Sequence, residues 1–261
     1  MHGPGRRGGE AVPGGEAVPG GEAVPGGEAV PGGEAVPGGE AVPAVRAGGL
    51  PRLGAVDGNL RHLLTQRLEL SALSMSDLAD AYALMADPRV WRHFPSGVHT
   101  SPDRTAEQLA REERSWELDG LGYWSVRLRG RVSLRGRESL RGRDSLWGRD
   151  ALRGRDSTFA GVGGCRLYAT AAWNLYYRIR PELQGNGYAT ELATAAIGAA
   201  RMVDPGPPIV ASVLAHNAAS RAVATKVGLR LVWEGTEPAG RRLLFCDRDI
   251  DPAALAALHA R

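Results

Sequence analysis

Apolar side chains recur every three to four residues, the spacing of a helix face, in four stretches of the chain. Two of these stretches open with a strong start signal. Ser101-Pro102 offers a capping hydroxyl and a proline at the first helical position, and Asn217 offers a capping amide. Gly228 follows the last stretch and tolerates the left-handed conformation that ends many helices. The pattern predicts helices over residues 78–87, 102–119, 187–202 and 217–227.

Shorter apolar and aromatic runs separate these helices and are typical of strands. They cover residues 66–71, 123–128, 159–168, 174–180, 209–214, 229–233 and 243–246. With the helices they give the order β-α-α-β-β-β-α-β-α-β-β, which predicts an α/β (α+β) fold with one mixed sheet. Residues 251–261 add a tail or a short helix, so the folded domain is expected over residues 61–250.

The N-terminal segment has a different character. Residues 8–43 are six tandem copies of Gly-Gly-Glu-Ala-Val-Pro. Two glycines and a proline in every six residues disfavour helix and central strand alike, and such a tract buries too little apolar area to offset its ordering entropy. We therefore expect residues 1–60 to be a disordered tail. It is not a signal peptide, because it lacks a continuous apolar region.

A second repeat occupies residues 127–156, a hexad built around Leu-Arg-Gly-Arg-(Asp/Glu)-Ser. It lies between two runs that are expected to pair as a hairpin, so it predicts a low-complexity insertion at the hairpin tip, where extra chain is tolerated. This segment holds 10 Arg and 4 acidic residues. It contributes +6 to a net charge of +3, so the rest of the chain carries −3. The basic character belongs to the insertion, which could bind polyanions without specificity.

Composition narrows the remaining classes. Two cysteines, Cys165 and Cys246, without a secretion signal fit a reducing compartment and give no metal-ligand spacing. No apolar stretch approaches the ~20 residues that span a bilayer. We expect a cytoplasmic protein with no metal, no membrane partner and no specific nucleic-acid partner. A homodimer is compatible with the sequence.

The strongest chemical signal is Gln184-Gly185-Asn186-Gly187-Tyr188-Ala189, which joins an apolar strand to a long helix. The first turn of a helix has free N–H groups and partial positive charge, and glycines let a phosphate approach the backbone. The alternative is a tight turn that needs glycine for its geometry alone. We favour phosphate binding, on the expectation that a turn by itself would not require Gly185 and Gly187 together with Gln184.

Three local patterns resemble the GNAT superfamily of N-acetyltransferases, and more narrowly its RimJ/RimL branch of ribosomal-protein N-terminal acetyltransferases. They are Leu64 to Leu70, Gln184 to Glu191, and Asn217-x-x-Ser220 with Gly228 eight residues later. The resemblance implies a GNAT fold, with a mostly antiparallel mixed sheet in which strands 174–180 and 209–214 are parallel and splay apart. It also implies acetyl-coenzyme A (acetyl-CoA) as co-substrate and a primary amine, on a protein or peptide N-terminus or a small molecule, as acceptor.

The resemblance carries over to individual positions. It implies that Asn217 contacts the coenzyme arm and that Ser220 protonates or hydrogen-bonds the departing thiolate. Many members of the superfamily use a tyrosine four residues further on, where this chain has Ala224. The expected coenzyme-binding residues are Ile179, Arg180, Gln184, Gly185, Asn186, Gly187, Tyr188, Ala189, Thr190, Asn217 and Ser220.

The acceptor side is less determined. An α-amine, with a pKa near about 7.7–8.0, needs less help to become neutral than a lysine amine near about 10.4. Candidates for a general base are Glu113, Glu117, Glu191 and His216, each of which also fits a surface or capping role. The segment 88–100 resembles the acceptor-facing loop of the family. Four tryptophans fit either an acceptor pocket or the core: Trp91, Trp116, Trp124 and Trp173.

Two other functions fit parts of the sequence. A domain that binds coenzyme A as a sensor or scaffold would account for the missing tyrosine and the unassigned base. Nucleic-acid association through the Arg-rich insertion is favoured only by local charge. A thiol-release assay with a panel of amines separates an enzyme from a coenzyme sensor.

Overall fold

The structure is a computed structural model that describes residues 54–55, 59–129, 158–168, 171–237 and 240–259. In this part of the chain nine strands form one sheet, in the order β1-β2-β3-β4-β5-β6-β7-β9-β8. The strands are β1 (Gly54–Ala55), β2 (His62–Leu64), β3 (Leu68–Ala72), β4 (Tyr123–Leu128), β5 (Phe159–Tyr168), β6 (Ala172–Ile179), β7 (Ile209–Leu214), β8 (Arg230–Glu237) and β9 (Gly240–Cys246).

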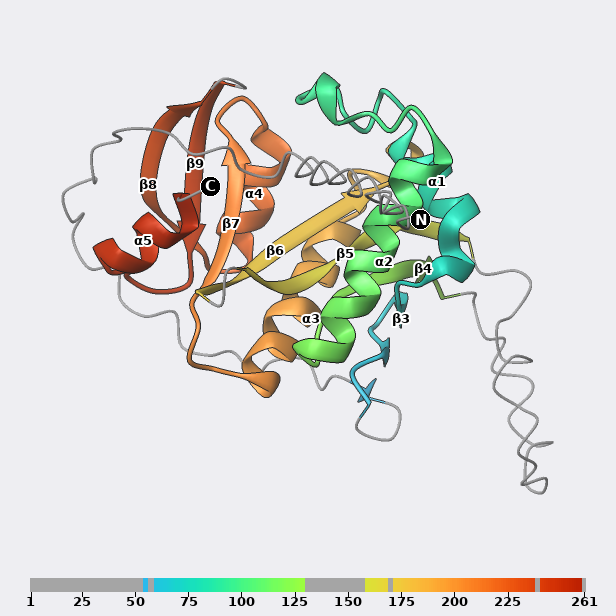
Figure 1. Cartoon of the computed structure of the whole chain (residues 1–261), viewed down its shortest axis with the longest axis horizontal. Coiled ribbons are helices and arrows are strands. Elements are labelled where there is room, and N and C mark those ends of the chain that lie inside the picture. Colours follow the sequence, from blue (N-terminus) through green and yellow to red (C-terminus); the bar gives the residue numbers. More distant parts are fainter. Residues whose placement is uncertain (1–53, 56–58, 130–157, 169–170, 238–239, 260–261) are drawn as a thin grey trace, which may run out of the picture.

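Every neighbouring pair in the sheet is antiparallel except β6 and β7. The parallel ladder between β6 and β7 holds only two residue pairs, Trp173 with Ile209 and Asn174 with Val210. The two strands meet at their N-terminal ends and diverge toward their C-terminal ends (Figure 1). This is the mixed, mostly antiparallel sheet with a splayed parallel pair that the resemblance implies, so the expected fold class is confirmed.

Helices cover both faces of the sheet. They are α1 (Leu78–Met85), α2 (Pro102–Leu118), α3 (Tyr188–Val203), α4 (Ala218–Lys226) and α5 (Pro252–His259). In Figure 1 α1 and α2 lie in front of the central strands and α3 passes behind them. The expected caps are present, because the Ser101 hydroxyl accepts from the Arg104 amide and the Asn217 side chain accepts from the Ser220 amide. Hydroxyl and amide oxygens satisfy N–H groups that the first helical turn leaves open.

The largest core cluster lies between the sheet and α3. The face of α3 that is turned toward the sheet is rich in alanine, and Ala193, Ala196, Ala199 and Ala200 are fully buried. Small side chains let a helix backbone come close to the strands. A second cluster lies under α1 and α2 and includes Leu84, and a third cluster joins the far strands to residues around α5.

All four tryptophans that could have lined an acceptor pocket lie in the core. Their exposed fractions are 6% for Trp91, 3% for Trp116, 0% for Trp124 and 1% for Trp173. The acceptor-pocket alternative is therefore wrong for these side chains. A large aromatic ring gains more by full burial here, and the indole N–H groups of all four rings donate to backbone carbonyl oxygens.

One boundary differs from the sequence expectation. The strand β1 falls inside the segment 1–60 that we expected to be disordered, where it pairs with β2. At the other end, residues 252–259 form a helix, which is one of the two expected alternatives, and Ile250 and Leu255 pack on the third core cluster. The Gly-Gly-Glu-Ala-Val-Pro repeats and nearly all of the Arg-rich insertion lie outside the described residues. No helix in the described part of the chain is long and apolar enough to cross a membrane.

Candidate active site

A cavity of about 420 Å³ opens where β6 and β7 diverge. Nine of the eleven residues expected to bind coenzyme line it: Ile179, Gln184, Gly185, Gly187, Tyr188, Ala189, Thr190, Asn217 and Ser220. The remaining two, Arg180 and Asn186, belong to the same connection between β6 and α3 but do not line the cavity. The segments that the sequence singled out therefore meet at one place, although 26 or more residues separate the Gly-rich loop from Asn217.

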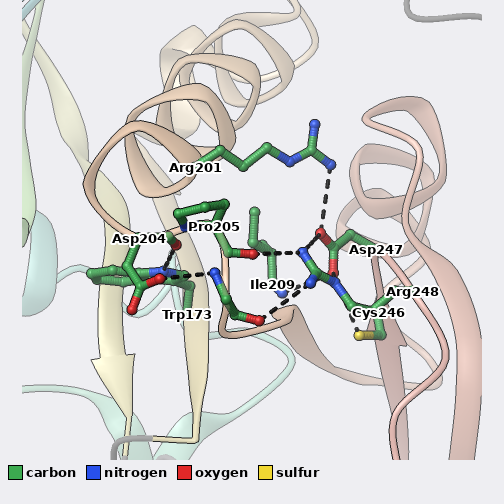
Figure 2. A network of polar contacts seen from close by, with 9 residues as sticks. Trp173, Arg201, Asp204, Pro205, Ile209, Cys246, Asp247 and Arg248 are labelled. Atoms are coloured by element: carbon green, nitrogen blue, oxygen red, sulfur yellow. Dashed lines mark hydrogen bonds and ion pairs between the residues drawn. The ribbon is translucent and has the colours of Figure 1, made fainter.

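The N-terminal ends of β6 and β7, around Trp173 and Ile209, are the closed end of this splayed pair. A polar network holds them together (Figure 2). The Asp247 carboxylate is 4% exposed, accepts from the Ile209 amide at 2.9 Å, and forms ion pairs with Arg248 at 3.1 Å and Arg201 at 3.5 Å. Burial alone would raise the pKa of Asp247, but the hydrogen bonds from Arg248 and Ile209 and the charge of Arg201 lower it overall. The Arg248 guanidinium also donates to two carbonyl oxygens of the loop before β7, and the Trp173 indole donates to the end of α3. These contacts fix the starts of both strands.

The Gly-rich loop has left-handed backbone at both of its glycines. The φ angles are 80° at Gly185 and 78° at Gly187, a region that side chains with a Cβ rarely adopt. The expectation that a turn alone would not require both glycines together with Gln184 is therefore wrong for the glycines, since the turn geometry by itself favours glycine at each position. The glycines remain compatible with a close approach of phosphate, because a Cβ at Gly185 would meet no atom within 4 Å.

The N-terminus of α3 points into the same loop. Gly187 is its N-cap and has no side chain that could cap the N–H groups of the first turn. The Gln184 amide nitrogen donates to the Ile179 carbonyl oxygen at 3.0 Å, which ties the loop to the end of β6. Residues 184–187 are exposed. Uncapped N–H groups, a helix dipole and an accessible backbone form an anion-binding site.

Across the splay, the first turn of α4 brings two predicted residues to the cavity. The Asn217 side-chain oxygen accepts from the Ser220 amide at 3.1 Å, so Asn217 is the helix cap. The Tyr177 hydroxyl on β6 donates to the Ser220 carbonyl oxygen at 3.0 Å, and burial raises the pKa of Tyr177 to about 12. Ala224, at the position where the resemblance implies a tyrosine in many members of the superfamily, is fully buried. Two hydroxyl groups, those of Ser220 and Tyr177, therefore stand at this end of the cavity.

Glu191 is not available as a general base. Its carboxylate accepts from the Thr65 hydroxyl at 2.6 Å, the Arg67 amide at 2.7 Å and the Arg67 guanidinium at 2.7 Å. Burial tends to raise the pKa of Glu191, but these hydrogen bonds together lower it. Arg67 also donates to the Asn186 carbonyl oxygen at 2.8 Å, so the pair fastens the Gly-rich loop and the start of α3 to β3. The role of Glu191 is structural.

The other base candidates also fall outside the cavity. Glu113 accepts from the Met75 amide at 2.9 Å, and Glu117 is exposed on α2. His216 Nε2 lies 3.0 Å from the His93 carbonyl oxygen, which fits a tautomer that donates through Nε2. The described residues that line the cavity include no Asp and no Glu.

The segment expected to face the acceptor contributes five residues to the cavity wall. Arg89, Val90, Arg92, His93 and Phe94 line the cavity. The pKa of His93 is lowered to about 4, first by burial and then by the charges of Arg178, His216 and Arg92. The imidazole of His93 is therefore neutral at physiological pH, and it is too weak a base to take a proton from an ordinary amine.

Comparison with known proteins adds the family. A family model described as the acetyltransferase (GNAT) domain matches residues 67–230. The chain belongs to the GNAT acetyltransferase family. A comparison with curated protein sequences finds no match.

Solved structures share the GNAT fold. An acetyltransferase from Agrobacterium tumefaciens is 22% identical with a TM-score of 0.53, over 72% of this chain and 94% of that one. A GNAT-family acetyltransferase from Bacillus anthracis is 16% identical with a TM-score of 0.54, over 71% and 96%. RimL, a ribosomal L7/L12 α-N-protein acetyltransferase in complex with coenzyme A, is 16% identical with a TM-score of 0.53, over 72% and 96%. At these identities the likeness shows the fold.

Sequence reasoning missed several residues of this GNAT site. Tyr177 and Arg178 carry no motif, and both line the cavity because it opens along β6 beyond the short ladder with β7. Arg67 and Thr65 contact Glu191 across more than 120 residues of chain. Arg67 lies inside the run Leu64 to Leu70 that carries the family resemblance, so its importance could have been predicted. Its contact with Glu191 could not be predicted from the sequence.

Proposed function

We propose that the chain transfers the acetyl group of acetyl-CoA to a primary amine, as a GNAT enzyme of the RimJ/RimL type. The observation that carries the proposal is the uncapped N-terminus of α3, which opens through the Gly-rich loop onto the splay of β6 and β7. RimL acts on a protein α-amine and binds coenzyme A at the same fold. A peptide or protein N-terminus is therefore the first acceptor to test, with small-molecule amines second.

The residues present fit the coenzyme. The backbone N–H groups from Gly185 to Thr190 would hold the pyrophosphate, and Lys226 on α4 lines the same cavity and adds a positive charge. The strand end at Ile179 would pair with the amide groups of the coenzyme arm, because β6 has no ladder partner on the β7 side after Asn174. Acetyl-CoA supplies the acetyl group as a thioester, which is open to attack by a neutral amine.

The side of the cavity lined by residues 89–94 and by Arg178 is the acceptor half. Its described residues include no group that would take the proton from the amine, so the amine must already be neutral when it binds. None of the carboxylates first considered lines the cavity, and His93, with its pKa near 4, does not hold a proton that an α-amine releases near pH 8. An α-amine has a usable neutral fraction near neutral pH without help. The main contribution of the site is then the orientation of the neutral amine against the thioester.

The leaving-group half offers two hydroxyls. Ser220 lies one turn into α4, and Tyr177 is kept protonated by its raised pKa. The Ser220 hydroxyl can donate a hydrogen bond to a sulfur anion as it forms, and the one Tyr177 proton can do so only by leaving the Ser220 carbonyl oxygen. Such donors act where charge develops, so they lower the barrier more than they strengthen binding.

A coenzyme-binding sensor remains a second candidate. It is favoured by the buried Ala224 at the position of the usual tyrosine and by a cavity in which no described lining residue is a carboxylate. The two functions differ in turnover and agree in coenzyme binding.

The test combines calorimetry with a thiol-release assay. Binding of acetyl-CoA by calorimetry, followed by release of free thiol with at least one peptide or small amine, supports an acetyltransferase. Binding without release across peptides that begin with each amino acid, and across a panel of small amines, supports the sensor. A folded protein that does not bind acetyl-CoA contradicts both.

A further inference from the structure

The acceptor half of the cavity is positively charged beyond what its own ion pairs neutralise. Five described lining residues are cationic: Arg89, Arg92, Arg178, Lys226 and Arg242. Arg89 is paired with Asp87 and Glu182, each at 2.6 Å, and Arg242 is paired with Glu237. Arg92, Arg178 and Lys226 form no ion pair with any described residue. Lys226 belongs to the coenzyme half, which leaves Arg92 and Arg178 for the acceptor half.

Side-chain alternation along β6 places Arg178 on the acceptor face. Leu175 and Ile179 belong to the core under α3, whereas Tyr176 packs against the cluster under α1 and α2. Arg178 is two residues from Tyr176 and therefore shares its face of the sheet. It also precedes Ile179, the strand end beside which the thioester is expected.

The guanidinium of Arg178 is held rigidly by neutral groups. It lies 3.3 Å from the ring centre of Trp91, its Nε donates to the Tyr176 hydroxyl, and its Nη1 donates to the Val90 carbonyl oxygen at 3.4 Å. Arginine has five N–H groups. These contacts use two of them, so three, including both on Nη2, have no hydrogen-bond acceptor among the described residues. A fixed guanidinium with open donors fits a planar carboxylate through two parallel hydrogen bonds.

The electrostatic surroundings agree with this geometry. The charges that act on His93 are those of Arg178, His216 and Arg92, and those that act on the buried His99 are Arg104, Arg178 and Arg111. Each of these charges lowers the pKa of the histidine on which it acts. The Glu112 carboxylate carries a charge that acts on Tyr176, but it is already paired with Arg166 at 3.2 Å.

We propose that the acceptor is an amine that carries a carboxylate close to the reacting nitrogen, and that Arg178 binds this carboxylate with support from Arg92. The inference rests on the proposed acetyltransferase function and names its substrate class. Two kinds of acceptor present this chemistry. One is a free amino acid, through its α-carboxylate, and the other is a peptide whose first residue is Asp or Glu.

The experiment compares acceptors in matched pairs that differ only in charge. The peptide pair is an Asp-first and an Asn-first tripeptide amide, and the small-molecule pair is a free amino acid and its primary amide. A charge-assisted hydrogen bond is about twice as strong as a neutral one. We expect kcat/KM to be at least about tenfold higher for the anionic member of one pair or both. The free amino acid has the less acidic ammonium group, so a preference for it would arise against the bias of its amine.

The variants assign the preference to a residue. Arg178→Gln should reduce the ratio within a pair to near one, and Arg178→Lys should restore part of it. Arg92→Gln, on an exposed loop, should reduce it by about threefold. Arg230→Gln, on the far edge of the sheet, is the matched control and should leave the ratio unchanged. If Arg178 only holds the loop through Trp91 and Val90, both members of a pair will lose rate equally and the ratio will persist.

The outcomes separate this inference from the function beneath it. Equal kcat/KM within both pairs, or a preference for the neutral member, overturns the carboxylate inference while the acetyltransferase stands. For a catalytically weak domain, calorimetry of the complex with coenzyme A gives the same comparison through the Kd of each peptide. If Arg178→Gln does not fold, the wild-type ratio and its decrease in Arg92→Gln decide. Failure of coenzyme binding removes the proposed function itself.

Discussion

The two ends of the β6–β7 pair have the same strands and opposite chemistry. At the closed end, a buried carboxylate, two guanidinium groups and an indole form hydrogen bonds and ion pairs with one another or with nearby backbone groups (Figure 2). At the open end, the ladder has stopped, the helix N-terminus of α3 is uncapped, and cations outnumber anions. Satisfied polar groups hold the strands together at one end, and unsatisfied ones at the other end are available to a ligand.

The contrast explains how β6 and β7 can diverge while the angle between them stays fixed. The closed end fixes the angle between β6 and β7, and the Arg67–Glu191 pair fixes the Gly-rich loop from the opposite side. The open end thus keeps its shape without a ligand. A preformed site has less ordering entropy to lose on binding. The comparison predicts that changes at the closed end act on stability and that changes at the open end act on affinity or turnover.

Asp247→Ala at the closed end should have the largest effect. It leaves the buried Ile209 amide without its acceptor and two guanidinium groups without their carboxylate. Because both arginines are partly exposed, we expect a loss of about 2–3 kcal/mol in the free energy of unfolding. Chemical denaturation measures it. Asp249→Ala, at a carboxylate that is 94% exposed, is the control and should change stability little. An unchanged midpoint in Asp247→Ala would break the comparison.

Gly187→Ala tests the open end against a control of equal backbone strain. Gly187 and Gly228 have φ angles of 78° and 87°, so an alanine at either position should cost about 1–2 kcal/mol of stability. Only Gly187 lies at the expected phosphate site. Coenzyme affinity, measured by calorimetry, should fall about tenfold or more in Gly187→Ala and should be unchanged in Gly228→Ala. Equal affinities in the two folded variants would reduce the Gly-rich loop to a structural turn.

Ser220→Ala and Tyr177→Phe test the hydroxyls beside the expected leaving group. If Ser220 assists thiolate departure, its removal should lower kcat by about tenfold to a hundredfold with little change in coenzyme affinity, since the bond strengthens only as charge develops. Tyr177→Phe should lower kcat less, and it also removes the bond that joins β6 to α4. Unchanged turnover in both variants, with a substrate for which chemistry limits the rate, would exclude a role for either hydroxyl.

The smallest expected effect is that of His93 on the dependence of kcat/KM on pH. His93 has a pKa near 4, below the usual range, so it stays neutral from pH 5 upward and contributes no inflection there. We expect kcat/KM to rise with pH and to level off near the pKa of the acceptor, about 8 for a peptide α-amine. His93→Ala should leave the position of this rise unchanged. A shift of the inflection by acceptors of different pKa would support the interpretation, and a fixed inflection near 6.5 would contradict it.

The sequence predicted the parts of this site that are local. The Gly-rich loop, the cap at Asn217 and the stop at Gly228 each depend on a few adjacent residues and their backbone preferences. The fold order followed from periodicity and from the resemblance. What could not be predicted depends on contacts between distant segments. Glu191 looked like a free carboxylate until β3 brought Arg67 to it, and the tryptophans could not be assigned to the core before their neighbours were known.

The extent of the family match and the contacts at the closed end together show which C-terminal truncation would disturb the fold. The matched GNAT domain ends at residue 230, but β9, which pairs with β7 along five residues, and Asp247, which holds Ile209, both follow that point. A fragment that stops at the end of the matched domain would expose the edge of β7 and would release the starts of both splayed strands. The unit that is recognised by sequence is therefore shorter than the unit that packs together, and β9 and Asp247 support the active site although neither is expected to touch the acetyl group.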